Sequence, residues 1–200
     1  KIYKNDFIDM GTPKDLKKLP KFLDKINFKP AVFLDRDGVI NHEKGFVHTK
    51  ENFIFQEGIF ELVTKANSNG YHVIIITNQS GIARGYFTEK KFLNLMNWMM
   101  HQFKAKGCVI SKFYYCPFHP NAKIISYKKN SYFRKPSPGM IINAKKEFSL
   151  NLKESLLIGD RITDIEAGNN AGIGKCFLFS SNEDYTHESG LKFKRINSLS

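Results

Sequence analysis

Short runs of consecutive apolar residues alternate with longer amphipathic stretches from residue 31 onward. Apolar side chains on consecutive positions, many of them β-branched, are typical of strands covered on both faces. Strands are predicted at AVFLD (31–35), HVIIIT (72–77), KFYYC (112–116), SLLIGD (155–160) and GKCFLF (174–179). Helical stretches lie between them, at about 58–69, at 88–106, from Pro138 onward and up to Ala171. This alternation predicts an α/β fold with a parallel sheet and helices on both of its faces.

The longest amphipathic stretch has its own start and stop signals. Thr88 is a favourable N-cap residue, and Gly107 follows the last helical position. At helical spacing the apolar side chains form one stripe, which consists of Phe92, Leu95, Met96, Met99 and Phe103. We interpret this stripe as ordinary core packing.

Two segments fall outside the alternation of strands and helices. Residues 117–137 form a long loop, and a loop of that length in a compact domain usually has a function. Residues 1–29 form a basic leader. The expected organisation is a leader or linker at 1–29, one domain at 30–185 and a C-terminal tail at 186–200.

Composition narrows the choice of partners only in part. Lys and Arg number 31 against 19 Asp and Glu, and the formal net charge of +12 favours anionic partners. The lysines are scattered along the 200 residues, so charge alone does not choose among nucleic acid, acidic membrane and phosphorylated metabolites. No apolar run approaches the ~20 residues that span a bilayer, so we expect no membrane partner.

Cysteine usage and the first residue give an expectation about location. Cys108, Cys116 and Cys176 are too few and too scattered for a disulfide framework, which favours a reducing cytoplasm. The chain starts at Lys1 and has no signal-peptide pattern. We therefore expect a cytoplasmic protein and a chain trimmed from something longer.

Polar residues follow three of the predicted strands at the point where each strand ends. Asp35 and Asp37 follow the first strand, Thr77 ends the second, and Asp160 ends the fourth, while Lys135 precedes the helix at Pro138. Ligands of parallel sheets bind beyond the carboxyl ends of the strands, so these side chains are expected to converge. Carboxylates, a hydroxyl and a lysine in one place suit a Mg²⁺ ion and a phosphate group.

This set of residues predicts phosphoryl transfer. Asp35 would attack phosphorus and form an aspartyl phosphate, and Asp37 would protonate the leaving oxygen and later accept a proton from water. Lys135 and the metal would offset the repulsion between Asp35 and an anionic substrate. Thr77 would donate its hydroxyl to a phosphate oxygen. Asp164, one helical turn after Asp160, is either a supporting group of the site or an exposed helix residue.

Four motifs resemble those of the haloacid dehalogenase (HAD) superfamily: FLDRDGVIN, IIITNQSGIARG, FRKPSPGM and LLIGDRITDIEAG. More narrowly, residues 31 to 180 are similar to the D-glycero-D-manno-heptose 1,7-bisphosphate phosphatases, which remove the C7 phosphate. The resemblance implies a Rossmann-like three-layer sheet of the HAD type without a large cap domain. It also implies an enzyme that works in carbohydrate metabolism, on a heptose destined for lipopolysaccharide or capsule.

The resemblance assigns roles to individual residues. It implies that Mg²⁺ is bound by the side chains of Asp35 and Asp160 and by the backbone carbonyl of Asp37. The transferring phosphate would be held by Thr77, Asn78 and Lys135. The remaining substrate-binding positions are Arg134 and Arg161, which match contacts to the sugar or its second phosphate, and the loop from Gln79 to Arg84, which would shape the pocket.

The chain departs from the family at a zinc-binding loop. Many relatives bind structural zinc through C-x-H and C-x-C before the Arg-Lys-Pro sequence. Here Cys116 is present, but Phe118, Ser131 and Phe133 replace the other ligands and His119 is one position off. A structural zinc site needs four ligands, so no structural zinc is expected. The aromatic residues Tyr114, Phe118, Tyr132 and Phe133 are expected to pack the loop instead.

The leader has a resemblance of its own. FIDMGTPKDLKKL (7–19) is similar to the closing segment of sugar-1-phosphate nucleotidyltransferases. It raises the hypothesis that the domain is fused to such an enzyme, whose activity would be coherent with a sugar-phosphate substrate.

Three alternatives to a heptose bisphosphate phosphatase stay open at this point. One is a phosphatase of histidinol phosphate or another small metabolite. A second is a nucleic-acid 3′-end phosphatase, but only SYKKNSYFRK (126–135) mixes basic and aromatic residues as such binding requires, so no nucleic-acid partner is expected. A third is a non-catalytic scaffold, which is disfavoured because every catalytic position holds a competent residue.

Overall fold

The computed structural model describes residues 28–180 and 190–199, together with the isolated positions 12, 14 and 17. The leader motif at 7–19 therefore lies largely outside the described residues, and the suggested fusion stays a prediction. None of the helices in the described part of the chain combines the length and apolar character needed to cross a membrane.

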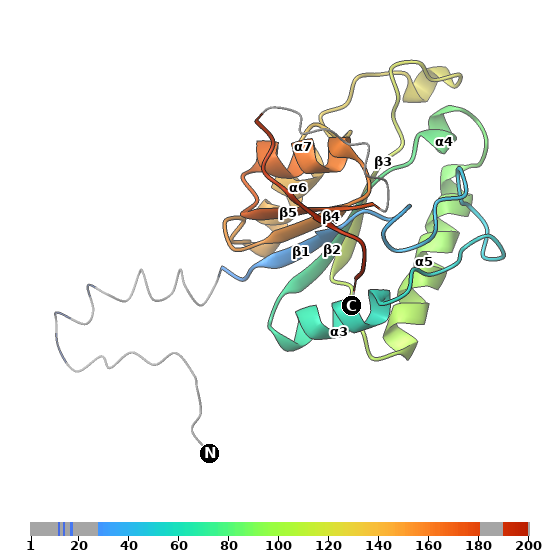
Figure 1. The fold of residues 1–200 in the computed structure, drawn as a ribbon. Coiled ribbons are helices and arrows are strands. Elements are labelled where there is room, and N and C mark those ends of the chain that lie inside the picture. Colours follow the sequence, from blue (N-terminus) through green and yellow to red (C-terminus); the bar gives the residue numbers. More distant parts are fainter. Residues whose placement is uncertain (1–11, 13, 15–16, 18–27, 181–189, 200) are drawn as a thin grey trace.

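The described strands form one parallel sheet of the order β3-β2-β1-β4-β5-β6 (Figure 1). Every neighbouring pair runs parallel, and β1 lies between β2 and β4. The central strand is buried along its whole length, as its continuous apolar sequence predicts. The strands are β1 (Ala31–Leu34), β2 (His72–Asn78), β3 (Lys112–Cys116), β4 (Leu156–Gly159), β5 (Lys175–Phe179) and β6 (Lys194–Ile196).

Helices cover both faces of this sheet, which confirms the predicted Rossmann-like α/β fold (Figure 1). Val32 and Leu34 of β1 pack with α3 and α5, whereas Ala31 and Phe33 pack with α6 and α7 on the opposite face. Alternation of side chains along a strand thus divides the core into two layers. The helical elements are α3 (Ile59–Ser68), α4 (Ser80–Ala83), α5 (Glu89–Ala105), the 3₁₀ turn η1 (Ile125–Tyr127), α6 (Gly139–Phe148) and α7 (Ile162–Ala171).

Helix α5 is the element that the sequence predicts most closely. Oγ1 of Thr88 accepts a hydrogen bond from the backbone N–H of Lys91 at 3.2 Å, as an N-cap residue should. All five apolar residues of the predicted stripe are buried. The interpretation of the stripe as core packing is confirmed.

The expected C-terminal tail at 186–200 is corrected by the structure. Residues 194–196 form β6, which pairs in parallel with β5, and Leu199 is 6% exposed against the core. This strand has three residues, of which Lys194 and Arg195 are charged, so it lacks the apolar run that marks the other strands. Edge strands are often short and charged, which explains why the sequence pattern misses it.

Candidate active site

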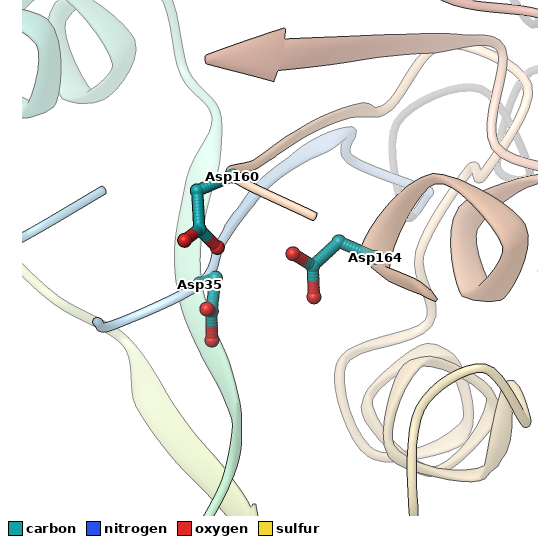
Figure 2. A group of neighbouring side chains, drawn as sticks. All are labelled: Asp35, Asp160 and Asp164. Atoms are coloured by element: carbon teal, nitrogen blue, oxygen red, sulfur yellow. The ribbon is translucent and has the colours of Figure 1, made fainter. Parts of the chain in front are cut away.

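Three carboxylates converge beyond the carboxyl ends of the central strands (Figure 2). Asp35 follows β1, Asp160 follows β4, and Asp164 lies in the first turn of α7. Each residue offers a carboxylate oxygen, and these oxygens lie within 4.8 Å of one another. Asp35 and Asp164 are only 8% and 2% exposed, so water does little to screen them. Such a cluster is unfavourable unless cations balance its charge.

Lys135 supplies one balancing cation. Its Nζ lies 2.7 Å from Oδ1 of Asp35 and 2.5 Å from Oδ1 of Asp164, and it donates to the carbonyl of Ile76 at 3.0 Å. Burial alone would lower the pKa of Lys135, but the carboxylates of Asp164 and Asp35 raise it above its ordinary value. Lys135 is therefore a fixed positive charge beside Asp35.

Asn78 at the end of β2 fixes the backbone of Lys135 from both sides. Its Nδ2 donates to the carbonyl of Lys135, and its Oδ1 accepts the N–H of Lys135, both at 3.1 Å. The sequence predicts that Asn78 holds a phosphate. In the structure its side-chain amide positions Lys135, and its contact with a phosphate stays a prediction.

The carboxylates keep an excess of negative charge in spite of Lys135. Burial raises the pKa of Asp35 to about 6, with Lys135 opposing the rise. Burial also raises the pKa of Asp160 to about 8, and the neighbouring charges of Asp35 and Asp164 add to the effect. Raised carboxyl pKa values mean that the site would favour a further cation.

Two observations show that the residues fit a divalent cation. Oδ1 of Asp160 is buried and has no hydrogen-bond partner among the described residues. Gly38, at φ 90°, faces Asp160 so closely that an added β-carbon would lie 2.3 Å from its Oδ2. The backbone after β1 and the carboxylate after β4 thus form a narrow, oxygen-rich site of the kind that Mg²⁺ prefers.

Asp37 lines the same cavity and is held by a network of hydrogen-bond donors. Arg36 is fully buried, and its Nη2 lies 2.6 and 2.7 Å from the two carboxylate oxygens of Asp37. Asn41 donates to Asp37 at 3.1 Å. Nε2 of Gln79 donates both to Asp37, at 3.0 Å, and to Oγ1 of Thr77, at 2.9 Å. Gln79, which is predicted to shape the pocket, thereby fixes the two neighbouring polar groups.

Three arginines lie in the same cavity as the carboxylate cluster. Arg84, Arg134 and Arg161 line one cavity of about 750 Å³ together with Asp35 and Lys135. Nε of Arg84 and Nη1 of Arg134 are buried, and neither has an acceptor within the described ranges. Burial and the charges of Arg84 and Arg161 lower the pKa of Arg134, although Cys116 opposes this. Unpaired buried donors of this kind indicate a site for an anion.

The loop that departs from the zinc-binding pattern is held by hydrogen bonds to Glu89. Tyr115 of β3 donates to Oε1 of Glu89 at 2.6 Å, and Tyr127 of η1 donates to Oε2 at 2.9 Å. The ring of Phe118 contacts that of Tyr127, with a centroid distance of 5.9 Å. We call Glu89, Tyr115 and Tyr127 the tyrosine clasp.

The expectation that four aromatic residues pack this loop holds for only part of the set. Tyr114 is buried and Phe118 contacts Tyr127. Tyr132 and Phe133 are 59% and 40% exposed, so the expectation is wrong for them. The backbone carbonyl of Tyr132 and one edge of its ring both lie close to Gly139.

The structure brings the predicted site residues into one cavity, and two residues that the sequence analysis does not assign support them, one inside the cavity lining and one behind it. Asp35, Asp37, Thr77, Lys135 and Asp160 all line it. The additions are Asp164, whose position four residues after Asp160 leaves its role undecided in sequence, and Arg36. No signal in the sequence distinguishes Arg36 from an exposed charge.

A carboxylate beside a fixed lysine and two further carboxylates, beyond the carboxyl ends of a parallel sheet, is typical of a HAD-type phosphatase. A HAD-hydrolase-like family model matches residues 132–191. The structure is similar to that of D,D-heptose 1,7-bisphosphate phosphatase from B. bronchiseptica, which was solved with magnesium and phosphate. The two share 25% identity at a TM-score of 0.74, over 85% of this chain and 93% of that chain.

Curated relatives agree with this class. D-glycero-alpha-D-manno-heptose-1,7-bisphosphate 7-phosphatase of Burkholderia mallei is 50% identical over 74% of this chain and 78% of the relative. The corresponding beta-D-manno enzyme of Photorhabdus laumondii is 42% identical over 80% of this chain and 85% of the relative. The chain belongs to the family of D-glycero-D-manno-heptose-1,7-bisphosphate 7-phosphatases and is a phosphoric ester hydrolase of the HAD superfamily.

Proposed function

We propose that the chain removes the C7 phosphate of D-glycero-D-manno-heptose 1,7-bisphosphate in a Mg²⁺-dependent reaction through an aspartyl phosphate on Asp35. The observation that carries the proposal is the pairing of two anion-binding features in one cavity. Asp35 and Lys135 form the first feature, and the arginines with unpaired buried nitrogens, Arg84 and Arg134, form the second in the same cavity. A substrate with two phosphates suits such a cavity.

In the first half-reaction a carboxylate oxygen of Asp35 attacks phosphorus. The bond between phosphorus and the sugar oxygen breaks, and Asp37 gives its proton to that oxygen, which leaves as the sugar hydroxyl. In the second half-reaction Asp37 accepts a proton from water while the water oxygen attacks phosphorus. Inorganic phosphate leaves and the carboxylate of Asp35 is restored.

The surrounding groups stabilise the charge of the transferring phosphoryl group. Lys135 neutralises part of it at short range, and the hydroxyl of Thr77 donates a hydrogen bond to it. Arg36 keeps the carboxylate of Asp37 oriented, because its guanidinium contacts both oxygens. Arg134 and Arg161 would bind the phosphate that stays on the sugar, with Arg84 beside them.

The side chains of Asp35 and Asp160 and the backbone carbonyl of Asp37 would hold Mg²⁺, with Asp164 beside them. The ion supplies positive charge that stabilises the transferring phosphoryl oxygens. Asp164 has a second role in this arrangement, because it pairs with Lys135 and so keeps the lysine directed at Asp35.

Phosphate release from a substrate panel tests the proposal. The panel contains both anomers of heptose 1,7-bisphosphate, histidinol phosphate and a 3′-phosphorylated oligonucleotide, each with Mg²⁺ and with EDTA. We expect Mg²⁺-dependent release from a heptose bisphosphate at a kcat/KM at least about 100-fold above the other two substrates, since two anchored phosphates position the ester. Comparable turnover of histidinol phosphate or of the oligonucleotide would overturn the substrate assignment.

The Asp35→Asn variant tests the mechanism. An amide is a poor nucleophile, so turnover should fall by at least about 1,000-fold while the fold is retained. Appreciable phosphate release by a folded Asp35→Asn protein would refute the covalent intermediate.

A further inference from the structure

Phe46 stands in a backbone conformation that is unusual for its size. Gly45 and Phe46 are consecutive left-handed residues, with φ values of 67° and 46°. Left-handed backbone suits Gly but is unfavourable for a bulky side chain, and such residues concentrate at functional sites. Burial of the ring does not offset the cost of this backbone conformation, because Phe46 is 42% exposed.

Several contacts hold this turn in place. Oε1 of Glu43 accepts the N–H of Gly45 at 2.6 Å, and Nδ1 of His48 lies 2.8 Å from the carbonyl oxygen of Phe46. The ring of His48 in turn stacks on Phe87 at a centroid distance of 4.9 Å. The turn is therefore fixed from both sides, which presents the Phe46 side chain in one direction.

The ring of Phe46 packs against Tyr86 and lies close to Gly81. It meets Tyr86 edge to face, with centroids 4.7 Å apart and planes at 66°. A β-carbon added to Gly81 of α4 would come within 3.0 Å of Cδ1 of Phe46, so the glycine leaves room for the ring. We call Phe46 and Tyr86 the aromatic wall.

Of the aromatic wall, Phe46 lines a cavity that is otherwise polar. Phe46 lines the same cavity as Asp35 and the arginines, and the only other large apolar side chain among its described lining residues is Ile162. A ligand bound there through phosphates at two ends would still present a sugar body with apolar C–H groups. Binding sites commonly combine a few oriented polar groups with an aromatic surface for this purpose.

We propose that Phe46, supported by Tyr86, is a specificity-determining residue that packs against the C–H face of a sugar whose phosphates are bound in this cavity. The inference rests on the proposed function for its substrate class, a sugar phosphate. It predicts that the ring contributes to binding of the sugar and contributes nothing to phosphoryl transfer itself.

The test compares a sugar ligand with a phosphate donor that has no sugar. Phe46→Asn removes the ring but keeps a residue that tolerates left-handed backbone, and Phe46→Tyr keeps a ring. The matched control is Val109→Asn, which changes an exposed apolar residue outside this cavity. Turnover of acetyl phosphate is measured with and without a hexose 1-phosphate or inorganic phosphate as competing inhibitor, and KM and kcat are measured on heptose 1,7-bisphosphate.

Phe46→Asn should weaken inhibition by the hexose phosphate, and raise KM for the heptose bisphosphate, by about five- to tenfold, the range of one aromatic contact. Turnover of acetyl phosphate and inhibition by inorganic phosphate should change less than about twofold, and Phe46→Tyr should behave as wild type. Equal losses on sugar and non-sugar ligands, or no loss on either, would overturn the proposal. Failure of wild type to hydrolyse heptose bisphosphate would refute the proposed function instead, since hexose phosphate inhibition reports on the ring independently.

Discussion

Asp164 holds Lys135 by an ion pair of 2.5 Å in which both side chains are only 3% exposed. The same aspartate accepts the backbone N–H of Arg161 at 3.0 Å, so it also fixes the start of α7. Gly159 makes the approach possible, because a β-carbon there would lie 2.2 Å from Cβ of Asp164. The position of Lys135 thus depends on Asp164, the carboxylate that α7 contributes to the cluster.

Asp164→Asn should therefore lower kcat by roughly 100-fold, because Lys135 loses one of its two carboxylate partners and its orientation toward Asp35. Steady-state kinetics on the best substrate of the panel measure this loss. Glu166→Gln is the matched control, since it removes a carboxylate two positions further along the same helix and should leave kcat unchanged. A folded Asp164→Asn protein with wild-type kcat would contradict this role.

Gly38→Ala tests the close approach of the backbone to Asp160. An alanine there would meet Oδ2 of Asp160 at 2.3 Å and would also adopt an unfavourable φ of 90°. We expect apparent Mg²⁺ affinity to fall by at least about tenfold, as measured by the Mg²⁺ dependence of turnover, because the carboxylate must move.

Gly70→Ala separates the cost of the backbone conformation from the steric clash with Asp160. Gly70 has a similar φ of 79°, but an added β-carbon meets nothing within 4 Å. It should cost about 1 kcal/mol of stability from its backbone and leave Mg²⁺ affinity unchanged. Equal Mg²⁺ affinities of the two variants would show that the close approach is unimportant.

The strands and the strand-end residues could be predicted because both depend on local sequence. A parallel sheet that is covered on both faces produces continuous apolar runs, and these mark β1, β2 and β4 and hence the residues that follow them. Lys135 is 100 residues from Asp35, and its place before the helix at Pro138 predicts that it joins the site, whereas the resemblance implies that it holds the phosphate. β6 escaped prediction because its few residues are mostly charged.

The remaining contacts depend on tertiary packing that no local pattern encodes. Arg36 is fully buried because it meets Asp37, the carbonyl of Val47 and the ring of Phe92. In sequence it is simply a charge between two aspartates. The tyrosine clasp likewise joins β3, η1 and the start of α5, and its three members are polar residues whose pairing no spacing indicates.

Glu89→Gln tests whether the tyrosine clasp keeps the 117–137 loop in place. The amide accepts hydrogen bonds less strongly than a carboxylate and can accept through only one atom, so one tyrosine hydroxyl loses its acceptor. We expect a decrease in Tm of a few degrees, about 1 to 2 kcal/mol, and a rise in KM for the bisphosphate through Arg134.

Glu147→Gln is the matched control, because Glu147 also accepts a tyrosine hydroxyl, from Tyr114 at 2.7 Å, but lies outside the cavity. It should leave KM unchanged. Metal analysis of the purified wild-type protein belongs to the same test, since the loop is predicted to hold no structural zinc. Stoichiometric zinc, or equal KM values for wild type and Glu89→Gln, would contradict a metal-free, clasp-dependent loop.

The pH dependence of stability should report on the carboxylate cluster. Burial raises the pKa of Asp35 to about 6 and that of Asp160 to about 8, whereas both would titrate near 3.9 in the unfolded chain. The folded state therefore binds more protons than the unfolded state between about pH 4 and pH 8. The contribution of Asp35 and Asp160 to the free energy of unfolding is therefore present at low pH and is lost as pH rises through their folded-state pKa values.

Mg²⁺ should reverse this loss, because it binds the deprotonated carboxylates and at high pH displaces no protons. The increase in Tm on adding Mg²⁺ to EDTA-treated protein should accordingly grow from pH 5 to pH 8.5, as measured by thermal denaturation at each pH. Asp160 has the more strongly raised pKa of the two carboxyl groups and is also a proposed metal ligand, so Asp160→Asn removes both properties at once. As pH rises, the Tm of this variant should fall less than that of wild type, and it should respond only weakly to Mg²⁺. If Mg²⁺ raised the Tm of wild type by the same amount at every pH, the assignment of these carboxylates as the metal site would be contradicted.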